Sequence, residues 1–188
     1  NLDIQNVDHE FIDGFDFYLH TSKDNDTNTA SKHVKNLAKI VRICLRKKWI
    51  TTDPFYGYKV KSKLVRREYL TADELKHIAS KKYSTVRLSQ VRDFFLFSCY
   101  TGLSYADVKK LRQTDIRIGI DGEKWLFSYR TKTGTPVAVP LIPFAADILE
   151  RYKDHPFCVN QDRALPISSN QKMNEYLVEI ADLSGIAK

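Results

Sequence analysis

The stretch that decides the fold is Ser98-Cys-Tyr-Thr-Gly-Leu-Ser-Tyr-Ala-Asp-Val-Lys-Lys-Leu111. It completes an apolar segment, turns at Thr-Gly-Leu and starts a new helix. Because residues 86–103 are apolar on nearly every side, they predict the central buried helix of a helical domain. Ser104 stands at an N-cap position, and Asp107 follows at the spacing of a capping arrangement. The local pattern leaves open whether Ser104 only begins a helix or also takes part in chemistry.

Further helices are predicted around this centre. Thr71 and Glu74 form a capping-box pattern that opens a helix near residue 71, and short helices are expected over 105–116 and 143–154. The last predicted helix, 168–186, has Gly185 as a plausible C-cap. Its inward-facing residues are expected to be Met173, Leu177, Ile180 and Ala181.

Residues 121–141 predict one small antiparallel sheet. Two short β runs flank Thr131-Lys-Thr-Gly-Thr135, which is a hairpin signal. Pro136 and Pro140 suit an exposed edge strand better than a central one, because proline cannot donate to the ladder.

The first part of the chain predicts a helical pair. A helix over residues 8–20 is expected to bury one side, and a stronger helix follows over residues 30–50. On the first helix the buried side comprises Phe11, Phe15, Tyr18 and Leu19, and on the second the apolar stripe comprises Val34, Leu37, Val41, Cys44 and Leu45. The opposite side of the second helix carries a narrow ladder of cations, Lys32, Lys35, Lys39, Arg42 and Arg46.

Charge is distributed very unevenly along a chain whose net charge is +7. Residues 1–30 hold seven acidic residues against one lysine, whereas residues 31–67 hold twelve lysines and arginines against one aspartate. Such a block predicts binding to a polyanion, although a solvated helix face and a charged linker would also account for it. The predicted domains are a helical DNA-binding domain over 1–52, a basic linker over 53–68 and a second domain over 69–188.

Composition narrows the class of protein. No apolar run is long enough to span a membrane, and the first residues lack the pattern of a signal peptide. Cys44, Cys99 and Cys158 are far apart and have no metal-ligand spacing, which favours a reduced, cytoplasmic protein over a disulfide scaffold.

Four segments, in order, resemble the tyrosine recombinases, also called phage-type integrases. Residues 100–116 resemble the family's Thr-Gly-Leu-Arg motif, and residues 130–141 resemble its lysine-bearing β-hairpin. Residues 67–75 are similar to the start of its catalytic domain, and 168–186 to the segment before its second arginine box. The likeness is greatest to integrases of Bacteroidetes-type conjugative transposons. It implies a mainly α fold, with a SAM-like core-binding domain joined to a truncated catalytic domain that carries one small antiparallel sheet.

The resemblance also implies a chemistry and partners. In the family a tyrosine attacks a DNA phosphodiester, and arginines, a lysine and histidine or tryptophan donors stabilise the transition state without metal or nucleotide cofactors. On this basis Lys132 is the expected general acid and Asp107 an orienting residue, although Asp107 is equally a helix-capping residue. The partner is double-stranded DNA, with no membrane. Expected DNA contacts are Lys32, Lys35, Lys39, Arg42, Arg46, Lys47, Lys59, Lys61, Lys63, Arg66 and Arg67.

Ser104 departs from the family pattern because it stands where the first catalytic arginine belongs. Arg130 is the first candidate to replace that arginine, since residues two apart in an extended strand project from the same face and Lys132 is two residues away. Arg92 is the second candidate, although a salt bridge to a nearby carboxylate would also explain it. The alternative is that no residue replaces the missing arginine and that the protein is inactive.

No His-x-x-Arg box follows residue 168, and none of the ten tyrosines stands after such a box as the family's nucleophile does. We therefore expect this chain to be a fragment that binds DNA without cleaving it and that is monomeric in solution, whereas the full-length protein would be tetrameric on DNA. The sequence leaves two alternatives open. One is a non-catalytic DNA-binding regulator on an integrase scaffold, and the other is a helical module that binds an acidic protein.

Overall fold

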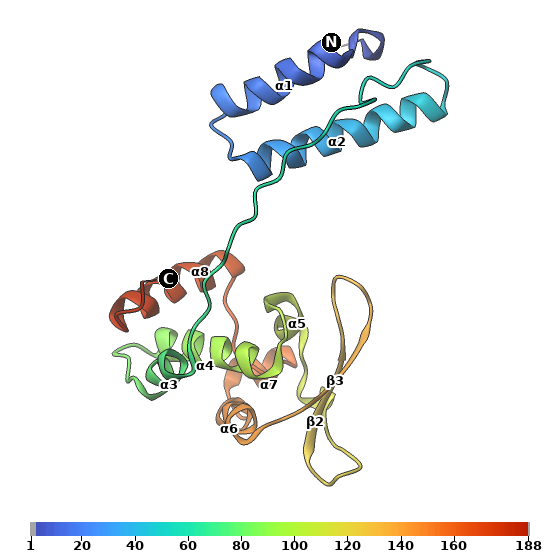
Figure 1. Ribbon diagram of the computed structural model, residues 1–188. Coiled ribbons are helices and arrows are strands. Elements are labelled where there is room, and N and C mark those ends of the chain that lie inside the picture. The colour runs from blue at the N-terminus through green and yellow to red at the C-terminus, as the bar shows by residue number, and fades with distance from the viewer. Residues whose placement is uncertain (1–2, 188) are drawn as a thin grey trace. The chain divides into compact units, whose positions relative to one another are not determined.

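The computed structural model describes residues 3–187, and the chain divides after Arg67 into two compact units (Figure 1). The predicted domains began at residue 1 and ended at residue 188, so their outermost residues lie outside the described part. The boundary between the units falls at the end of the segment that the sequence predicted as a linker, residues 53–68. Each unit has its own buried cluster of apolar side chains.

The first unit is built on two antiparallel helices that follow a short 3-10 turn (Figure 1). Two acidic residues begin these helices: Asp8 accepts the Phe11 N–H at 2.7 Å, and Asp26 accepts the Thr29 N–H at 2.7 Å. Part of the acidic N-terminal block therefore serves as helix caps. The elements are η1 (Ile4–Asn6), α1 (His9–Thr21) and α2 (Thr27–Arg46).

The buried side of α1 differs from the prediction. Ile12 is fully buried and Leu19 nearly so, whereas Tyr18 is exposed and Phe11 and Phe15 are only partly covered. The prediction was wrong about Tyr18 because the helix turns Ile12, rather than the aromatic residues, toward α2. The stripe on α2 is confirmed at Val34, Val41 and Cys44, with Leu37 and Leu45 at its half-buried margins.

Residues 55–63 pack against the two helices of the first unit. Phe55, Tyr58 and Val60 contact its apolar cluster. Asn28 on α2 binds the backbone of Lys63 in both directions, donating to its carbonyl at 2.8 Å and accepting its N–H at 2.9 Å. Most of the predicted linker is thus fixed to α2, while Leu64 and Val65 beyond it are exposed.

The second unit is organised around α4, as predicted. This helix contacts α3, α6 and α8, and Leu88, Phe94 and Phe97 are among its buried residues. The predicted capping box is present at the start of α3, where Thr71 and Glu74 exchange hydrogen bonds of 2.7 and 3.2 Å. The helices are α3 (Ala72–Ser80), α4 (Val86–Thr101), α5 (Tyr105–Lys110), α6 (Pro143–Tyr152), α7 (Pro156–Gln161) and α8 (Asn170–Leu183).

A three-stranded antiparallel sheet in the order β1-β2-β3 stands beside these helices (Figure 1). Leu126 is fully buried on its inner face, and β3 is an edge strand, as its two prolines predicted. The strand elements are β1 (Ile116–Ile118), β2 (Lys124–Tyr129) and β3 (Pro136–Pro140), with a 3-10 turn, η2 (Gln113–Asp115), before them. The prediction of a helix over 105–116 was wrong beyond Lys110, since the chain leaves the helix there to form η2 and β1.

The last helix, α8, closes the unit much as predicted. Met173 and Ile180 are buried, and Leu177 and Ala181 are partly buried. Gly185 follows the helix with φ of 67°, and the Ile186 N–H donates to the Ala181 carbonyl at 3.0 Å. This is a Schellman motif, in which glycine supplies the left-handed conformation.

Candidate functional site

The site is built on the turn between α4 and α5. Gly102 ends α4 with φ of 65°, a conformation that suits glycine, and the chain then re-enters a helix at Ser104. The Ser104 hydroxyl donates to Asp107 Oδ2 at 2.8 Å and accepts the Asp107 N–H at 3.3 Å. The helix-capping interpretation of this pair is therefore confirmed, and it fixes the Asp107 carboxylate at the start of α5.

Asp107 also holds the end of β2. Its Oδ1 accepts the Thr131 N–H at 2.7 Å, and its Oδ2 lies 3.3 Å from Nη1 of Arg130. The same Nη1 donates to the Gly102 carbonyl at 2.9 Å. One buried carboxylate thus joins two segments that are distant in sequence, the start of α5 and the residues after β2, and the guanidinium group of Arg130 lies beside the α4–α5 turn that Ser104 follows.

The electrostatics of Asp107 favour its charged form. Burial alone would raise the pKa, since only 4% of the side chain is exposed. Hydrogen bonds from Thr131, Ser104 and Arg130 outweigh that effect and hold the pKa of Asp107 well below its usual range. The site therefore contains a fixed anion that orients a cation, and the Arg130 side chain keeps 36% of its surface exposed.

Arg130 and Lys132 are close in the chain, but not for the predicted reason. The expected extended strand ends at Tyr129, and residues 131–133 form a turn closed by the Gly134 N–H to the Arg130 carbonyl at 2.8 Å. The premise that both side chains project from one face of a strand was therefore wrong. Lys132 is exposed at the tip of the hairpin, while Arg130 is anchored at its base.

Arg92 has a different environment. Its Nε and Nη2 lie 2.8 Å from Asp93 Oδ1, and its Nη1 donates to the Lys81 carbonyl at 2.9 Å. Only 14% of its side chain is exposed. The salt bridge that the sequence offered as the alternative explanation of Arg92 is present.

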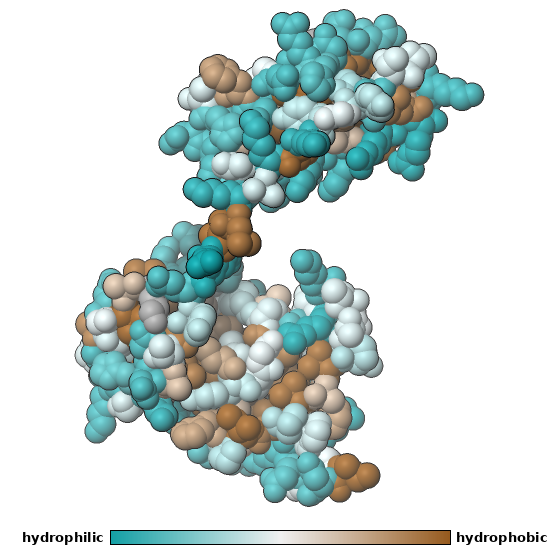
Figure 2. Space-filling model, in the orientation of Figure 1, coloured by the Kyte–Doolittle hydropathy of each residue, from teal (hydrophilic) through white to brown (hydrophobic). Residues whose placement is uncertain are grey.

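The cation ladder on α2 lies on the exposed side of that helix, as predicted. Hydrophilic side chains cover much of the first unit in Figure 2, and the packed face of α2 is on the opposite side from the ladder. The exposed residues include all the predicted contacts of this unit: Lys32, Lys35, Lys39, Arg42, Arg46, Lys47, Lys59, Lys61, Lys63, Arg66 and Arg67. Two are partly engaged, since Lys61 lies 3.8 Å from Asp16 and Lys47 stacks over Trp49 at 4.9 Å.

Sequence reasoning missed Lys110 and the backbone groups that complete the site. Lys110 Nζ donates to the Tyr129 carbonyl and so ties α5 to β2 a second time. The Gly102 carbonyl and the Thr131 N–H carry no side-chain signal, so only the folded backbone reveals them. Within residues 3–187, no cluster of His, Cys, Asp or Glu could hold a metal ion, and no helix is long and apolar enough to cross a membrane.

Residues 1–63 match the phage integrase SAM-like domain. A lambda integrase dimer bound to a COC′ core site superposes with a TM-score of 0.78 at 19% identity, over 100% of this chain and 66% of that one. This is an integrase fold. The fold is also that of a lambda integrase tetramer bound to a Holliday junction, with a TM-score of 0.74 at 19% identity over 98% of this chain and 53% of that one.

A further structure with this fold is the XerH site-specific recombinase in a pre-cleavage complex with its difH substrate. It matches with a TM-score of 0.67 and 15% identity, over 97% of this chain and 55% of that one. The chain therefore spans between about half and two thirds of the length of these structures. No curated protein sequence matches it.

Proposed function

We propose that this chain is the DNA-binding part of a site-specific DNA recombinase, an integrase of a mobile genetic element of the Bacteroidetes conjugative-transposon type. The reaction would proceed by strand exchange through a 3′-phosphotyrosyl intermediate. The observation that carries the proposal is the Arg130 guanidinium beside the turn at Ser104, held by a buried carboxylate and still partly open to solvent.

A phosphate is the ligand that this arrangement suits. Among the described residues, the side-chain hydrogen bonds of Arg130 all come from Nη1, and Nη2 and Nε donate none. An arginine that is oriented on one side and free on the other can donate two parallel bonds to a phosphate. Lys132, at the tip of the hairpin, would supply the general acid, and Asp107 would position Arg130.

The α2 ladder supplies the affinity for DNA in this proposal. Exposed lysines and arginines along one helix face neutralise phosphates and release counterions, which gives binding that is strong and sequence-independent. The cations at 59–67 would continue the contact along the same strand. The partner is double-stranded DNA, on which the whole recombinase would assemble as a tetramer, and the three free cysteines suit the reducing cytoplasm.

The 188 residues contain no His-x-x-Arg segment. We therefore propose that they bind duplex DNA as a monomer and do not cleave it by themselves. A covalent adduct between this chain and a nicked duplex would contradict that part of the proposal.

Duplex binding tests the proposal most simply. Fluorescence anisotropy with a labelled duplex should show an affinity that falls by about 10³-fold or more between about 50 and about 200 mM salt. The triple variant Lys35→Glu, Lys39→Glu, Arg42→Glu should bind at least about 100-fold more weakly at the lower salt concentration, because three phosphate contacts become repulsive.

The matched control reverses three exposed lysines of the second unit, Lys76, Lys82 and Lys172, to glutamate. This variant has the same net charge and should lose less than about tenfold in affinity, the part due to long-range attraction. Equal losses in both variants would show that net charge, and not the α2 face, determines binding.

A further inference from the structure

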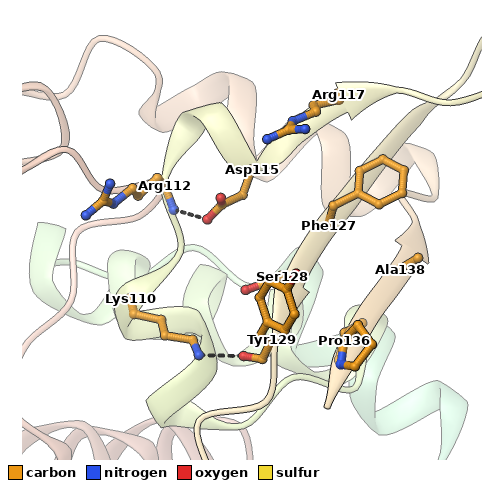
Figure 3. Close-up of a pocket in the computed structure, with 10 residues that line it drawn as sticks. Lys110, Arg112, Asp115, Arg117, Phe127, Ser128, Tyr129, Pro136 and Ala138 are labelled. Carbon is orange, nitrogen blue, oxygen red and sulfur yellow. Dashed lines mark hydrogen bonds between the residues drawn. The ribbon is translucent and has the colours of Figure 1, made fainter. Parts of the chain in front are cut away.

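One side of β2 is open over its second half. β1 pairs only with Lys124–Leu126 of β2, so residues 127–129 have no partner strand on that side. The chain between α5 and β1 lies opposite this edge, and the Lys110 ammonium group bridges to the Tyr129 carbonyl. The result is a groove of about 680 Å³ between that chain segment and the sheet, shown in Figure 3.

Two aromatic rings, Phe127 and Tyr129, line the sheet side of the groove. Trp125, Phe127 and Tyr129 alternate along β2 and therefore share one face. Phe127 pairs with Ala138, and Tyr129 pairs with Pro136, small partners that leave the rings uncovered. The exposed fractions are 39% for Phe127 and 62% for Tyr129. Such a row on the solvent side of a sheet contributes little to the core and is typical of a binding surface.

The opposite side of the groove is cationic. Lys110, Arg112 and Arg117 line it, with Asp115 as the one carboxylate among the lining residues. Asp115 Oδ2 is already engaged with the Arg112 N–H at 2.9 Å. Arg112 lies 3.3 Å from Asp162 in an ion pair whose partners are both 58% exposed, an interaction that solvent screens strongly. The groove therefore favours an anionic ligand.

The groove continues the candidate phosphate site. Tyr129 directly precedes Arg130, and Lys110 follows Asp107 by less than one helical turn on α5. A nucleic-acid strand with one phosphate at Arg130 would thus find the next cation at Lys110 and the first ring at Tyr129.

We propose that this groove binds an unpaired DNA strand, with phosphates along Arg130, Lys110 and Arg117 and bases stacked on Tyr129 and Phe127. Aromatic platforms combined with a positive groove bind single strands without sequence preference. A duplex cannot use the rings in this way, because its bases are stacked on one another. The inference deepens the proposed recombinase function, in which a strand is freed from its duplex during exchange.

An acidic peptide is the other ligand that cations would attract. Addition of a peptide as a further strand on β3 is disfavoured, because Pro136 and Pro140 remove backbone donors from that strand. The exposed rings favour the DNA strand, since each can stack on any base.

The test uses the 188-residue chain with Trp49→Phe, so that Trp125 is the remaining tryptophan. Trp125 stacks on Phe127 with ring centroids 6.3 Å apart, so its fluorescence should report on bases in the groove. We expect oligo-thymidylate to quench this fluorescence and to bind, by anisotropy, at least about fivefold more weakly to Tyr129→Leu and about 25-fold more weakly to the double variant Phe127→Leu, Tyr129→Leu. Tyr129→Phe should keep the wild-type affinity, because the ring remains.

Phe157→Leu is the matched control, since Phe157 is a 41% exposed ring on α7 outside the groove. Single-strand affinity that is unchanged in the double variant, or lost equally in Phe157→Leu, would overturn the proposal. Poly-glutamate that competes as well as the oligonucleotide, with the same dependence on Phe127 and Tyr129, would also overturn it in favour of an acidic protein partner.

Duplex binding measured in parallel separates the two proposals. The double variant should bind blunt duplex normally through α2, and the α2 triple variant should still show the dependence of single-strand binding on Tyr129. Failure of duplex binding with intact single-strand binding would contradict the proposed function alone, and the reverse result would contradict the groove alone.

Discussion

The second unit contains two arginine–aspartate pairs that differ in how far the arginine is exposed to solvent. The carboxylates of Asp93 and Asp107 are equally buried, with 2% and 4% of their side chains exposed. Arg92 is 14% exposed and donates from all three of its nitrogens, whereas Arg130 is 36% exposed and donates from one. Burial of the carboxylate therefore does not distinguish a structural pair from a candidate binding pair. The exposure of the arginine and the number of its nitrogens that are already bonded do.

The pair at Asp93 belongs to a closed network between α4 and α6. Asp93 Oδ2 accepts the Tyr152 hydroxyl at 2.8 Å and a further bond from Arg151. Burial and the nearby Asp93 carboxylate raise the pKa of Tyr152, so its phenol remains a donor. Arg92 and Tyr152 pair with Asp93 inside the protein, and Arg151, which is 52% exposed, pairs with it from the surface. These bonds fit a role in holding the helices together.

The largest effect on stability is expected from Asp93→Ala. It leaves two arginines and a tyrosine hydroxyl without their acceptor, and should lower the free energy of unfolding by about 3–5 kcal/mol. Urea denaturation followed by Trp125 fluorescence in the Trp49→Phe background measures this. Asp154→Ala, at an exposed aspartate, is the control and should cost less than about 0.5 kcal/mol. A loss below about 1 kcal/mol for Asp93→Ala would show that the network is not structural.

Asp107→Ala should have a smaller effect, about 2–3 kcal/mol by the same assay. It removes the helix cap and the acceptor for Thr131, but Arg130 can turn toward solvent instead of staying buried without a partner. If Asp107→Ala proves more destabilising than Asp93→Ala, the distinction between an open and a closed pair fails.

A still smaller effect is expected from pH. The folded-state pKa of Asp107 lies below its ordinary value of 3.8, so its charge stabilises the fold above that value and the contribution is lost as pH falls toward the folded pKa. Asp107→Asn lacks this contribution. The difference in unfolding free energy between the wild type and Asp107→Asn should therefore be constant near pH 6 and narrow below about pH 4. A difference that widens on acidification would contradict the ionised state of Asp107.

Much of the fold could be read from the sequence, because hydrophobic periodicity and caps act locally. The apolar run before Gly102, the box at Thr71 and the prolines of β3 each specified an element. The sequence did not reveal that Ile12, rather than Tyr18, faces α2, since that choice depends on how the two helices rotate against each other. It also missed β1, whose three residues form a strand only because β2 lies beside them.

The candidate site was predictable only in part. Side chains pointed to Asp107 and Arg130, but the predicted strand geometry between Arg130 and Lys132 was wrong. Backbone groups of Gly102 and Thr131 orient the site, and their positions depend on a turn that brings β2 to α5. The choice between Arg92 and Arg130 likewise required the three-dimensional environment of each guanidinium group.

The salt dependence of duplex binding tests the central claim, that Arg130 is available to a phosphate and Arg92 is not. Log Kd is measured against log salt concentration for the wild type, Arg130→Gln and Arg92→Gln, at a temperature at which circular dichroism shows each protein to be folded. The account predicts that Arg130→Gln reduces the slope by about 0.9, the loss of one phosphate contact, and that Arg92→Gln leaves the slope unchanged. A wild-type slope for Arg130→Gln, or a reduced slope for Arg92→Gln alone, would contradict it.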